Sequence, residues 1–129
     1  MKKNDFNILE KDLVLLGAGH SNIEVLRNFS LKPIKGIRIT LITNKLESPY
    51  SGMVPGYIEG VYKWSDITID LVKMSFHYDF RLICSEVTKI DGLNNKIFLK
   101  NREPLGYDYL SINTGIDSKD KISRRQKKL

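Results

Sequence analysis

The sequence predicts an α/β fold in which a parallel sheet carries a crossover helix. Three observations predict it: apolar, strand-like runs at 12–16 and 37–43, a helical pattern between them, and a turn, GAGHS, that joins the first run to that pattern. Two strands connected through a helix lie parallel, with a right-handed crossover. The expected unit is therefore strand, glycine turn, helix and strand.

Each element of this unit has its own pattern. Residues 12–16, DLVLL, are too few for a helix and are typical of a strand buried on both faces. One face of the following helix is formed by residues at i, i+3, i+4 and i+7, and Pro33 and Gly36 end that helix. These residues are Asn22, Val25, Leu26 and Phe29. Residues 37–43, IRITLIT, are rich in β-branched side chains and predict the second strand.

The second half of the domain mixes one long loop with shorter elements. Residues 44–66 carry two prolines and three glycines and predict a shaped, ligand-facing loop with one helical turn near 56–59. A short helix is expected from about Asp70, and one bent strand over 80–91. An Asp-Gly turn then predicts a hairpin with 96–100, and 107–115 is the last expected strand.

Length and charge limit the function classes. A chain of 129 residues suits one domain, expected over 12–116, with an N-terminal extension over 1–11. The net charge of +6 is concentrated in 117–129, which hold six Lys or Arg against two Asp. This segment contains no aromatic residue and predicts a basic, disordered tail, so we expect no nucleic-acid partner.

Cysteine and hydropathy patterns make further exclusions. Cys84 is the only cysteine, which rules out an internal disulfide, a CxxC redox pair and a cysteine zinc cluster. It follows an apolar run, and we expect a packed, inert thiol there and no metal site. No apolar stretch reaches the roughly 20 residues that span a bilayer, and the N-terminus lacks a signal-peptide core. These features predict a cytoplasmic protein without a membrane span.

The glycine turn is the strongest candidate for a ligand site. Gly17 permits a sharp turn, and Gly19 lets the backbone approach a phosphate without a Cβ in the way. Amides at the helix start, around His20 and Ser21, would then point at the anion, and the helix dipole adds roughly half a positive charge. His20 could also donate to a phosphate oxygen or be an ordinary capping or surface residue.

Two positions depart from the dinucleotide-binding pattern. Asn22 stands where the third glycine of G-x-G-x-x-G is usual, so either its side chain bonds a nearby backbone group or the helix is slightly displaced. The end of the second strand offers Thr43 and Asn44 to a ribose, in place of the usual carboxylate. By this route NAD, NADP, FAD and S-adenosylmethionine all stay open as ligands.

Four segments together resemble a known superfamily. In the order and spacing of GAGHSNIEVL, PYSGMVPGYIEG, EVTKID and YDYLSINTG, the chain looks like the N-terminal part of the pyridine nucleotide-disulfide oxidoreductases. It is most similar to the NADH dehydrogenase-like flavoproteins found fused ahead of selenide, water dikinase. The resemblance covers 12–115 and implies a Rossmann-like FAD/NAD(P)-binding domain, a parallel sheet with a crossover β-hairpin or meander, that is incomplete.

The resemblance also implies roles for individual residues. Gly17 and Gly19 would face the FAD pyrophosphate, and main-chain groups near Val87 would meet the adenine. Thr114 and Gly115 would lie beside the cofactor. The candidates for contact with the flavin ring are Tyr50, Ser51 and Gly52.

The function that the resemblance implies is the FAD-binding portion of a flavin-dependent NAD(P)H oxidoreductase. In that superfamily the second glycine motif, for NAD(P)H, lies beyond the position of Gly115, so we expect this chain to be inactive unless a downstream domain or chain completes it. The alternative is a non-catalytic nucleotide-binding module or fragment that works with such a partner. A methyltransferase is disfavoured by the hairpin before the last strand and by the missing acid after the second.

Other chemistry-bearing residues have simpler interpretations. No Ser/His/Asp or paired-carboxylate arrangement is recognisable, and His77 has no partner at metal-ligand spacing, so a structural or exposed histidine is expected. For Tyr57, Tyr62 and Trp64 we expect core packing rather than a ring pocket.

Overall fold

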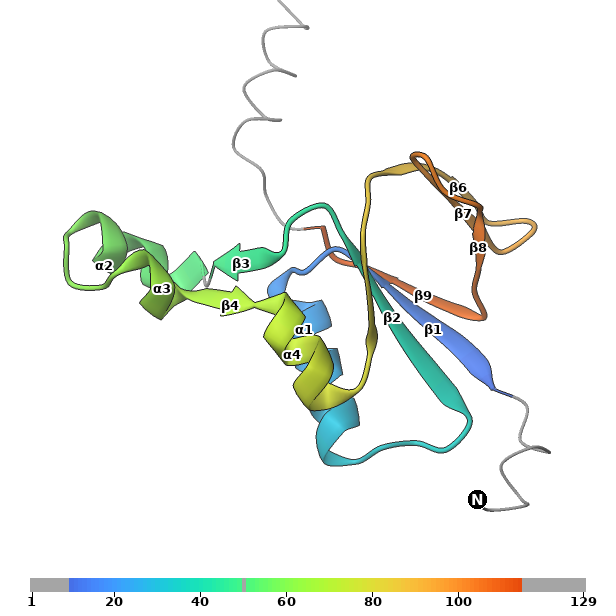
Figure 1. Ribbon diagram of the computed structural model, residues 1–129, viewed down its shortest axis with the longest axis horizontal. Helices are drawn as coiled ribbons and strands as arrows, with labels where there is room; N and C mark the ends of the chain where they lie inside the picture. The colour runs from blue at the N-terminus through green and yellow to red at the C-terminus, as the bar shows by residue number, and fades with distance from the viewer. Residues whose placement is uncertain (1–9, 50, 115–129) are drawn as a thin grey trace, which may run out of the picture.

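A computed structural model describes residues 10–49 and 51–114, and its centre is a four-stranded parallel sheet (Figure 1). The strands lie in the order β5-β2-β1-β9. Their bounds are β1 Lys11–Leu16, β2 Ile37–Thr43, β5 Arg81–Cys84 and β9 Tyr109–Ile112. β1 pairs in parallel with both β2 and β9, and β2 with β5. The predicted α/β fold with a parallel sheet is confirmed.

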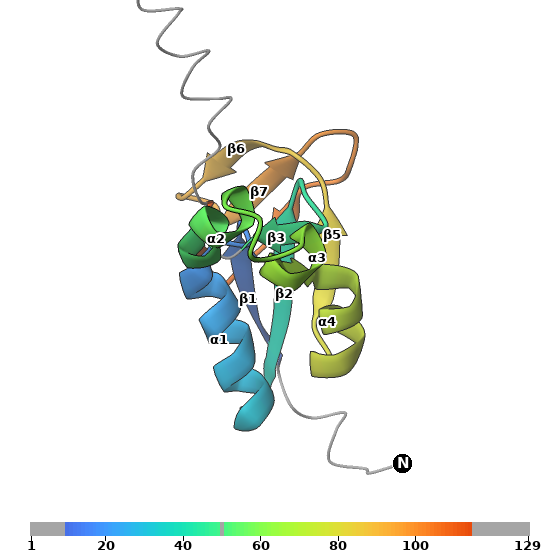
Figure 2. The same cartoon turned by 90° about the vertical axis from the view of Figure 1, so that its left-hand side faces the viewer.

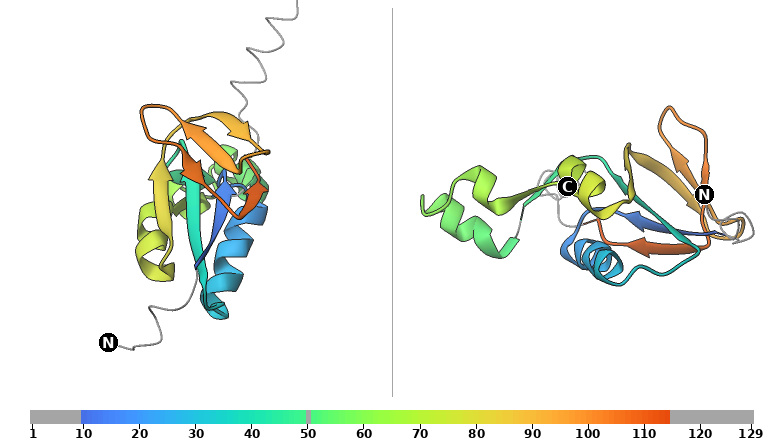
Figure 3. Two further views of the ribbon diagram at one scale, coloured as in Figure 1. Left: turned by 90° about the vertical axis from the view of Figure 1, so that its right-hand side faces the viewer. Right: turned by 60° about the horizontal axis from the view of Figure 1, so that its bottom comes forward.

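Different layers cover the two faces of this sheet. Helices α1 (His20–Leu31) and α4 (Leu71–Tyr78) lie on one face, where they pack against Leu15 and Leu41 (Figure 2). A second, antiparallel sheet lies on the other face and packs against Val14 and Ile42 (Figure 3). Its strands are β6 Val87–Asp91, β7 Lys96–Leu99 and β8 Leu105–Gly106. Because β1 and β2 are covered on both sides, their apolar residues run continuously instead of alternating.

Helix α1 begins and ends where the sequence predicts, but its buried face is turned. The fully buried residues are Asn22, Ile23 and Leu26, whereas Val25 and Phe29 are only half-buried. Successive residues of a helix are about 100° apart, so exchanging Val25 for Ile23 turns the centre of the buried face around the helix axis toward Ile23. Asn22 remains on this face and is completely buried.

Residues 80–91 form two strands instead of one bent strand. β5 belongs to the central sheet and β6 to the antiparallel sheet, and the chain changes sheets at Ser85 and Glu86. The Ser85 amide still donates to the carbonyl of Thr43 at 3.0 Å, and the Glu86 carbonyl accepts from Lys100 at 2.9 Å. An apolar pattern does not reveal such a change of sheet.

The predicted hairpin is confirmed, with β6 and β7 antiparallel around the Asp-Gly turn. Asp91 holds this turn, since its carboxylate accepts from the amides of Leu93 and Asn94 and from the Asn94 side chain. These hydrogen bonds, the Asn94 side chain first, lower the pKa of the Asp91 carboxyl. The two-residue strand β8 extends the hairpin and is too short for any sequence pattern.

Residues 47–70, which we call the arm, project from the carboxyl edge of the central sheet (Figure 1). The arm is more regular than the expected loop. Its elements are β3 Glu47–Pro49, η2 Ser51–Met53, α2 Val54–Ile58, α3 Trp64–Ile67 and β4 Thr68–Asp70, with β3 and β4 antiparallel. Asp70 then caps α4 by accepting from the amides of Val72 and Lys73, as expected for a helix that starts there.

The aromatic residues of the arm pack on one another, outside the core. Tyr57 and Trp64 meet edge to face with ring centroids 5.2 Å apart, and Tyr62 lies against Gly56. All three aromatic side chains are exposed, so the expectation of core packing was wrong. The arm extends beyond the layers of the domain, so these side chains pack within the arm and not in the core.

Candidate functional site

The topology of the central sheet points to one place for a ligand. From β1 the chain moves outward to β2 and β5, and it then returns to place β9 on the other side of β1. The order of strands therefore reverses between β1 and β9, and all four carboxyl ends share one edge. Ligands of open α/β sheets bind outside the carboxyl ends at such a switch point. The glycine turn lies there, between β1 and α1.

The two glycines are in close contact with the end of β9. Gly17 has a φ of +90°, and a Cβ there would come within 2.4 Å of the Asn113 carbonyl oxygen and of the Thr114 Cα. A Cβ on Gly19 would lie 2.1 Å from Oδ1 of Asn113. Both positions thus exclude side chains, but the atoms that require this belong to the protein itself.

The first amides of α1 are partly satisfied by Asn113. The Gly19 amide donates to the Asn113 carbonyl at 3.0 Å, and the Asn22 amide donates to Oδ1 of Asn113 at 3.3 Å. Within 10–49 and 51–114 no hydrogen-bond acceptor meets the amides of Ala18 and Ser21. Asn113 therefore occupies part of the row of amides that was expected to be accessible. His20 and Ser21 are exposed at the start of the helix.

Asn22 satisfies itself against the backbone, one of its two predicted alternatives. Its Nδ2 donates to the carbonyls of Leu16 at 3.1 Å, Gly17 at 2.8 Å and Ser111 at 3.3 Å, while its Oδ1 accepts from the Ser111 hydroxyl at 2.8 Å. The side chain is completely buried. In place of the third glycine, this residue joins the glycine turn to β9.

The expected ribose contacts look different in the structure. Thr43 is buried, and its hydroxyl both donates to the Lys45 carbonyl at 3.0 Å and accepts from the Lys45 amide at 3.2 Å. A ribose contact from this hydroxyl therefore requires the local turn to open. Asn44 is exposed at the carboxyl edge, next to the strand end. Of the two, Asn44 is the residue better placed to reach a ribose.

The remaining predicted residues fall into three groups. Tyr50 and Gly115 lie outside the described residues. Ser51 and Gly52 belong to η2 in the arm, and space around Gly52 is open to 4 Å. Val87, the first residue of β6 in the antiparallel sheet, pairs with Leu99 and is half-buried against the core, while Thr114 is exposed at the switch point. The glycine turn and Thr114 are thus brought together, and Val87 belongs to a separate layer.

Two contacts of the site were missed from the sequence. Asn113 was not singled out, although a polar residue directly after an apolar strand was a usable signal. Ser48 was missed as well: its hydroxyl donates to the Ala18 carbonyl at 2.7 Å and so fixes the base of the arm to the glycine turn. No local pattern marks this pairing, because 30 residues separate its two members.

Cys84 is exposed, so the expectation of a packed thiol was wrong. It is the last residue of β5, which lies at the edge of the central sheet. Side chains alternate along this strand end: Ile83 is buried and Cys84 points outward. His77 is exposed as well, in accord with its simpler interpretation.

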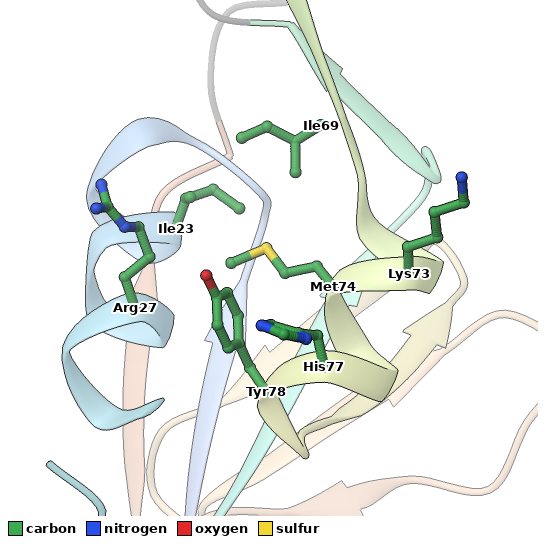
Figure 4. Close-up of a pocket in the computed structure, with 7 residues that line it drawn as sticks. All are labelled: Ile23, Arg27, Ile69, Lys73, Met74, His77 and Tyr78. Carbon is green, nitrogen blue, oxygen red and sulfur yellow. The ribbon is translucent and has the colours of Figure 1, made fainter. Parts of the chain in front are cut away.

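An open groove of about 630 Å³ lies away from the switch point, between α1 and α4. Figure 4 shows Ile23 and Met74 meeting across it, with the Tyr78 hydroxyl beside them and Arg27 and Lys73 pointing outward. None of the predicted cofactor residues lines this groove. The described residues also contain no cluster of three or more His, Cys, Asp or Glu that could bind a metal. None of the helices in this part of the chain has the length and apolar character that a bilayer span requires.

Comparisons with known proteins agree with this geometry. No family model matches the chain. A curated relative, the sulfide-quinone reductase of Aquifex aeolicus, is 29% identical over 111 residues, which are 83% of this chain and 25% of the relative. The structure of the Aquifex aeolicus sulfide:quinone oxidoreductase superposes with a TM-score of 0.73 and 26% identity, over 83% of this chain and 25% of that one.

A second solved structure, NDH2 of Plasmodium falciparum in complex with NADH, superposes with a TM-score of 0.69 and 21% identity over 84% of this chain. It is covered over 23% of its own length. The chain therefore spans about a quarter of the proteins that it resembles. The chain has the α/β Rossmann-like fold of FAD/NAD(P)-binding domains, in the form found in pyridine nucleotide-disulfide oxidoreductase-like proteins.

Proposed function

We propose that this chain is the FAD-binding portion of a flavin-dependent NAD(P)H oxidoreductase. The observation that carries the proposal is the glycine turn at the β1/β9 switch point, in a sheet that superposes on a sulfide:quinone oxidoreductase with a TM-score of 0.73. The finer resemblance, to flavoproteins fused ahead of selenide, water dikinase, belongs to the same proposal. So do a cytoplasmic location and a further domain or chain that supplies the NAD(P)H site.

The residues of the turn have specific roles in this proposal. The amides of Ala18 and Ser21 donate to the pyrophosphate, and the dipole of the 12-residue helix α1 adds to the attraction. Asn44 bonds the ribose, and the main chain near Val87 contacts the adenine. When bound, the flavin would accept a hydride from NAD(P)H and pass two electrons to an acceptor. The arm, through Ser51 and Gly52, approaches the flavin ring.

The test is direct binding to the 129-residue chain. In a titration followed by amide NMR, ADP, FAD and NAD should each shift the signals of Gly17 to Ser21, with ADP binding near the millimolar level, or about −4 kcal/mol. FAD binding at least tenfold tighter than ADP supports a flavin site. Equal affinity for all three ligands supports the alternative, a non-catalytic nucleotide-binding module. Absence of any shift at 10 times that concentration, about 10 mM, contradicts both.

A variant at position 20 tests whether the helix start binds through its backbone. His20→Ala removes the imidazole and keeps every main-chain amide of the turn, so ADP should bind about as tightly as it does to the unchanged chain. A several-fold loss would assign the contact to the imidazole instead of the amides of Ala18 and Ser21. Lys73→Ala, in the distant groove, should bind like the unchanged chain.

A further inference from the structure

Asn113 occupies the space that the glycine turn leaves open. Its amide donates to the Leu16 carbonyl at 2.8 Å, and its carbonyl accepts from Gly19 at 3.0 Å, so its backbone belongs to the sheet and the turn. Its side chain, in contrast, lies over the turn and belongs to neither. Oδ1 lies where a side chain at position 19 would stand, and it accepts from the Asn22 amide at 3.3 Å. A neutral carboxamide thus lies over the start of α1.

Only part of this arrangement is able to change. The Asn113 carbonyl cannot leave Gly19 without moving β9, which is paired with β1 over four residues. Among the described residues the half-buried carboxamide takes part in one long hydrogen bond, and rotation about its χ angles would release it. A phosphate oxygen forms charge-assisted bonds about twice as strong as those of a neutral carbonyl. A bound phosphate would therefore replace Oδ1 at the Asn22 amide.

We propose that the Asn113 side chain competes with the cofactor phosphates for the start of α1 and lowers their affinity; this inference rests on the proposed function. The amides of Ala18 and Ser21, which meet no acceptor among the described residues, receive the phosphate first. The Asn113 carboxamide then swings away and frees the Asn22 amide and the space above Gly19. In the chain without cofactor, the same carboxamide stabilises the turn.

The experiment compares Asn113→Ala and Asn113→Asp with the unchanged 129-residue chain. Asn113→Ala removes the competitor, so ADP and inorganic pyrophosphate should bind about three- to tenfold more tightly, while adenosine, which lacks phosphate, should bind as before. Asn113→Asp keeps an acceptor of the same shape but adds a negative charge, which should weaken ADP binding. Raising the salt concentration should reduce that loss, because it screens the repulsion. Lys73→Ala is the control that should leave all affinities unchanged.

The outcomes separate this inference from the function on which it rests. If the unchanged chain binds ADP and Asn113→Ala binds it equally or more weakly, competition is wrong and the carboxamide is instead a partner of the phosphate. If neither chain binds ADP, the proposed function itself fails. Thermal unfolding gives an independent readout: without ligand, Asn113→Ala should melt at a lower temperature than Asn113→Asp, which retains the helix cap.

Discussion

The glycine turn and the arm share the carboxyl edge of the sheet and are joined by the Ser48–Ala18 hydrogen bond, yet they are built in opposite ways. At the turn, the buried polar side chain of Asn22 makes four hydrogen bonds to its surroundings. In the arm, Ile58 and Val61 leave 77% and 68% of their area exposed, and α2 contributes no buried residue. At the turn the buried polar side chain is satisfied by its surroundings, whereas the arm offers apolar surface.

This difference teaches where the stability of the domain lies. The turn is connected to β1, β2 and β9, so a change there disturbs the central sheet. The arm is attached by its two short strands and by Ser48, so a change on its outer side disturbs little beyond itself. Three substitutions, Gly17→Ala, Asn22→Leu and Ile58→Ala, test this contrast, and their expected effects on the free energy of unfolding decrease in that order; the others are controls.

Gly17→Ala should have the largest effect. The new Cβ meets the backbone of Asn113 and Thr114 at 2.4 Å, and alanine disfavours a φ of +90°. We expect a loss of about 2–5 kcal/mol, from a conformational cost of about 1–2 kcal/mol and from overpacking. Urea unfolding followed by circular dichroism measures it, and a chain already unfolded in buffer would be the upper extreme.

Gly60→Ala is the matched control for Gly17. Gly60 has a similar φ of +83°, but a Cβ added there would have no described atom of another residue within 4 Å. Its loss should be about 1–2 kcal/mol, the conformational cost alone. Equal losses for the two glycines would mean that β9 does not press on the turn, and the contrast between turn and arm would lose its main support.

Asn22→Leu should have the next largest effect. Leucine has a similar volume but leaves the carbonyl of Gly17 and the hydroxyl of Ser111 without their bonds in a buried place. An unsatisfied buried polar group costs about 1–3 kcal/mol, so we expect a total loss of about 2–4 kcal/mol. Ser111→Ala removes only one of the four bonds and should cost about 1 kcal/mol. An Asn22→Leu chain as stable as the original would contradict this account of the turn.

The sequence was informative where local patterns and global structure agree. Apolar runs at 12–16 and 37–43 located β1 and β2, and the Asp-Gly turn located the hairpin. The glycine turn was located as well, and the comparisons support the fold class that it predicted. These features depend on residues close together in the chain, so a short window of sequence contains them.

What was missed depends on contacts between distant segments. Asn22 and Ser111 are 89 residues apart, and Asn22 and Asn113 are 91 apart, so no window places an asparagine side chain over the helix start. Cys84 was expected to be packed because its neighbours are apolar, but it ends β5, the edge strand of the central sheet, and its side chain is exposed there. Edge position is a property of the complete topology. The packing of Tyr57 on Trp64 has the same origin, in a segment that leaves the domain.

Ile58→Ala, in the arm, should have the smallest effect. Ile58 is exposed, so removing its outer atoms should change the free energy of unfolding by no more than about 0.5 kcal/mol. The matched control is the same substitution at Ile67, in α3 of the same arm, whose side chain is completely buried and should lose about 2–5 kcal/mol. Urea unfolding of both variants gives the comparison.

The comparison of these two isoleucines shows whether the exposed apolar residues of the arm are needed for its fold. If Ile67→Ala is costly and Ile58→Ala is neutral, the arm folds on its inner residues, and its outer apolar residues are dispensable for the fold of this chain. A loss above 1 kcal/mol at Ile58 would mean instead that the residue is covered in solution, and the supposed contrast with the glycine turn would be wrong. Because the two changes remove the same atoms, the difference between them reports mainly how deeply each side chain is buried and packed.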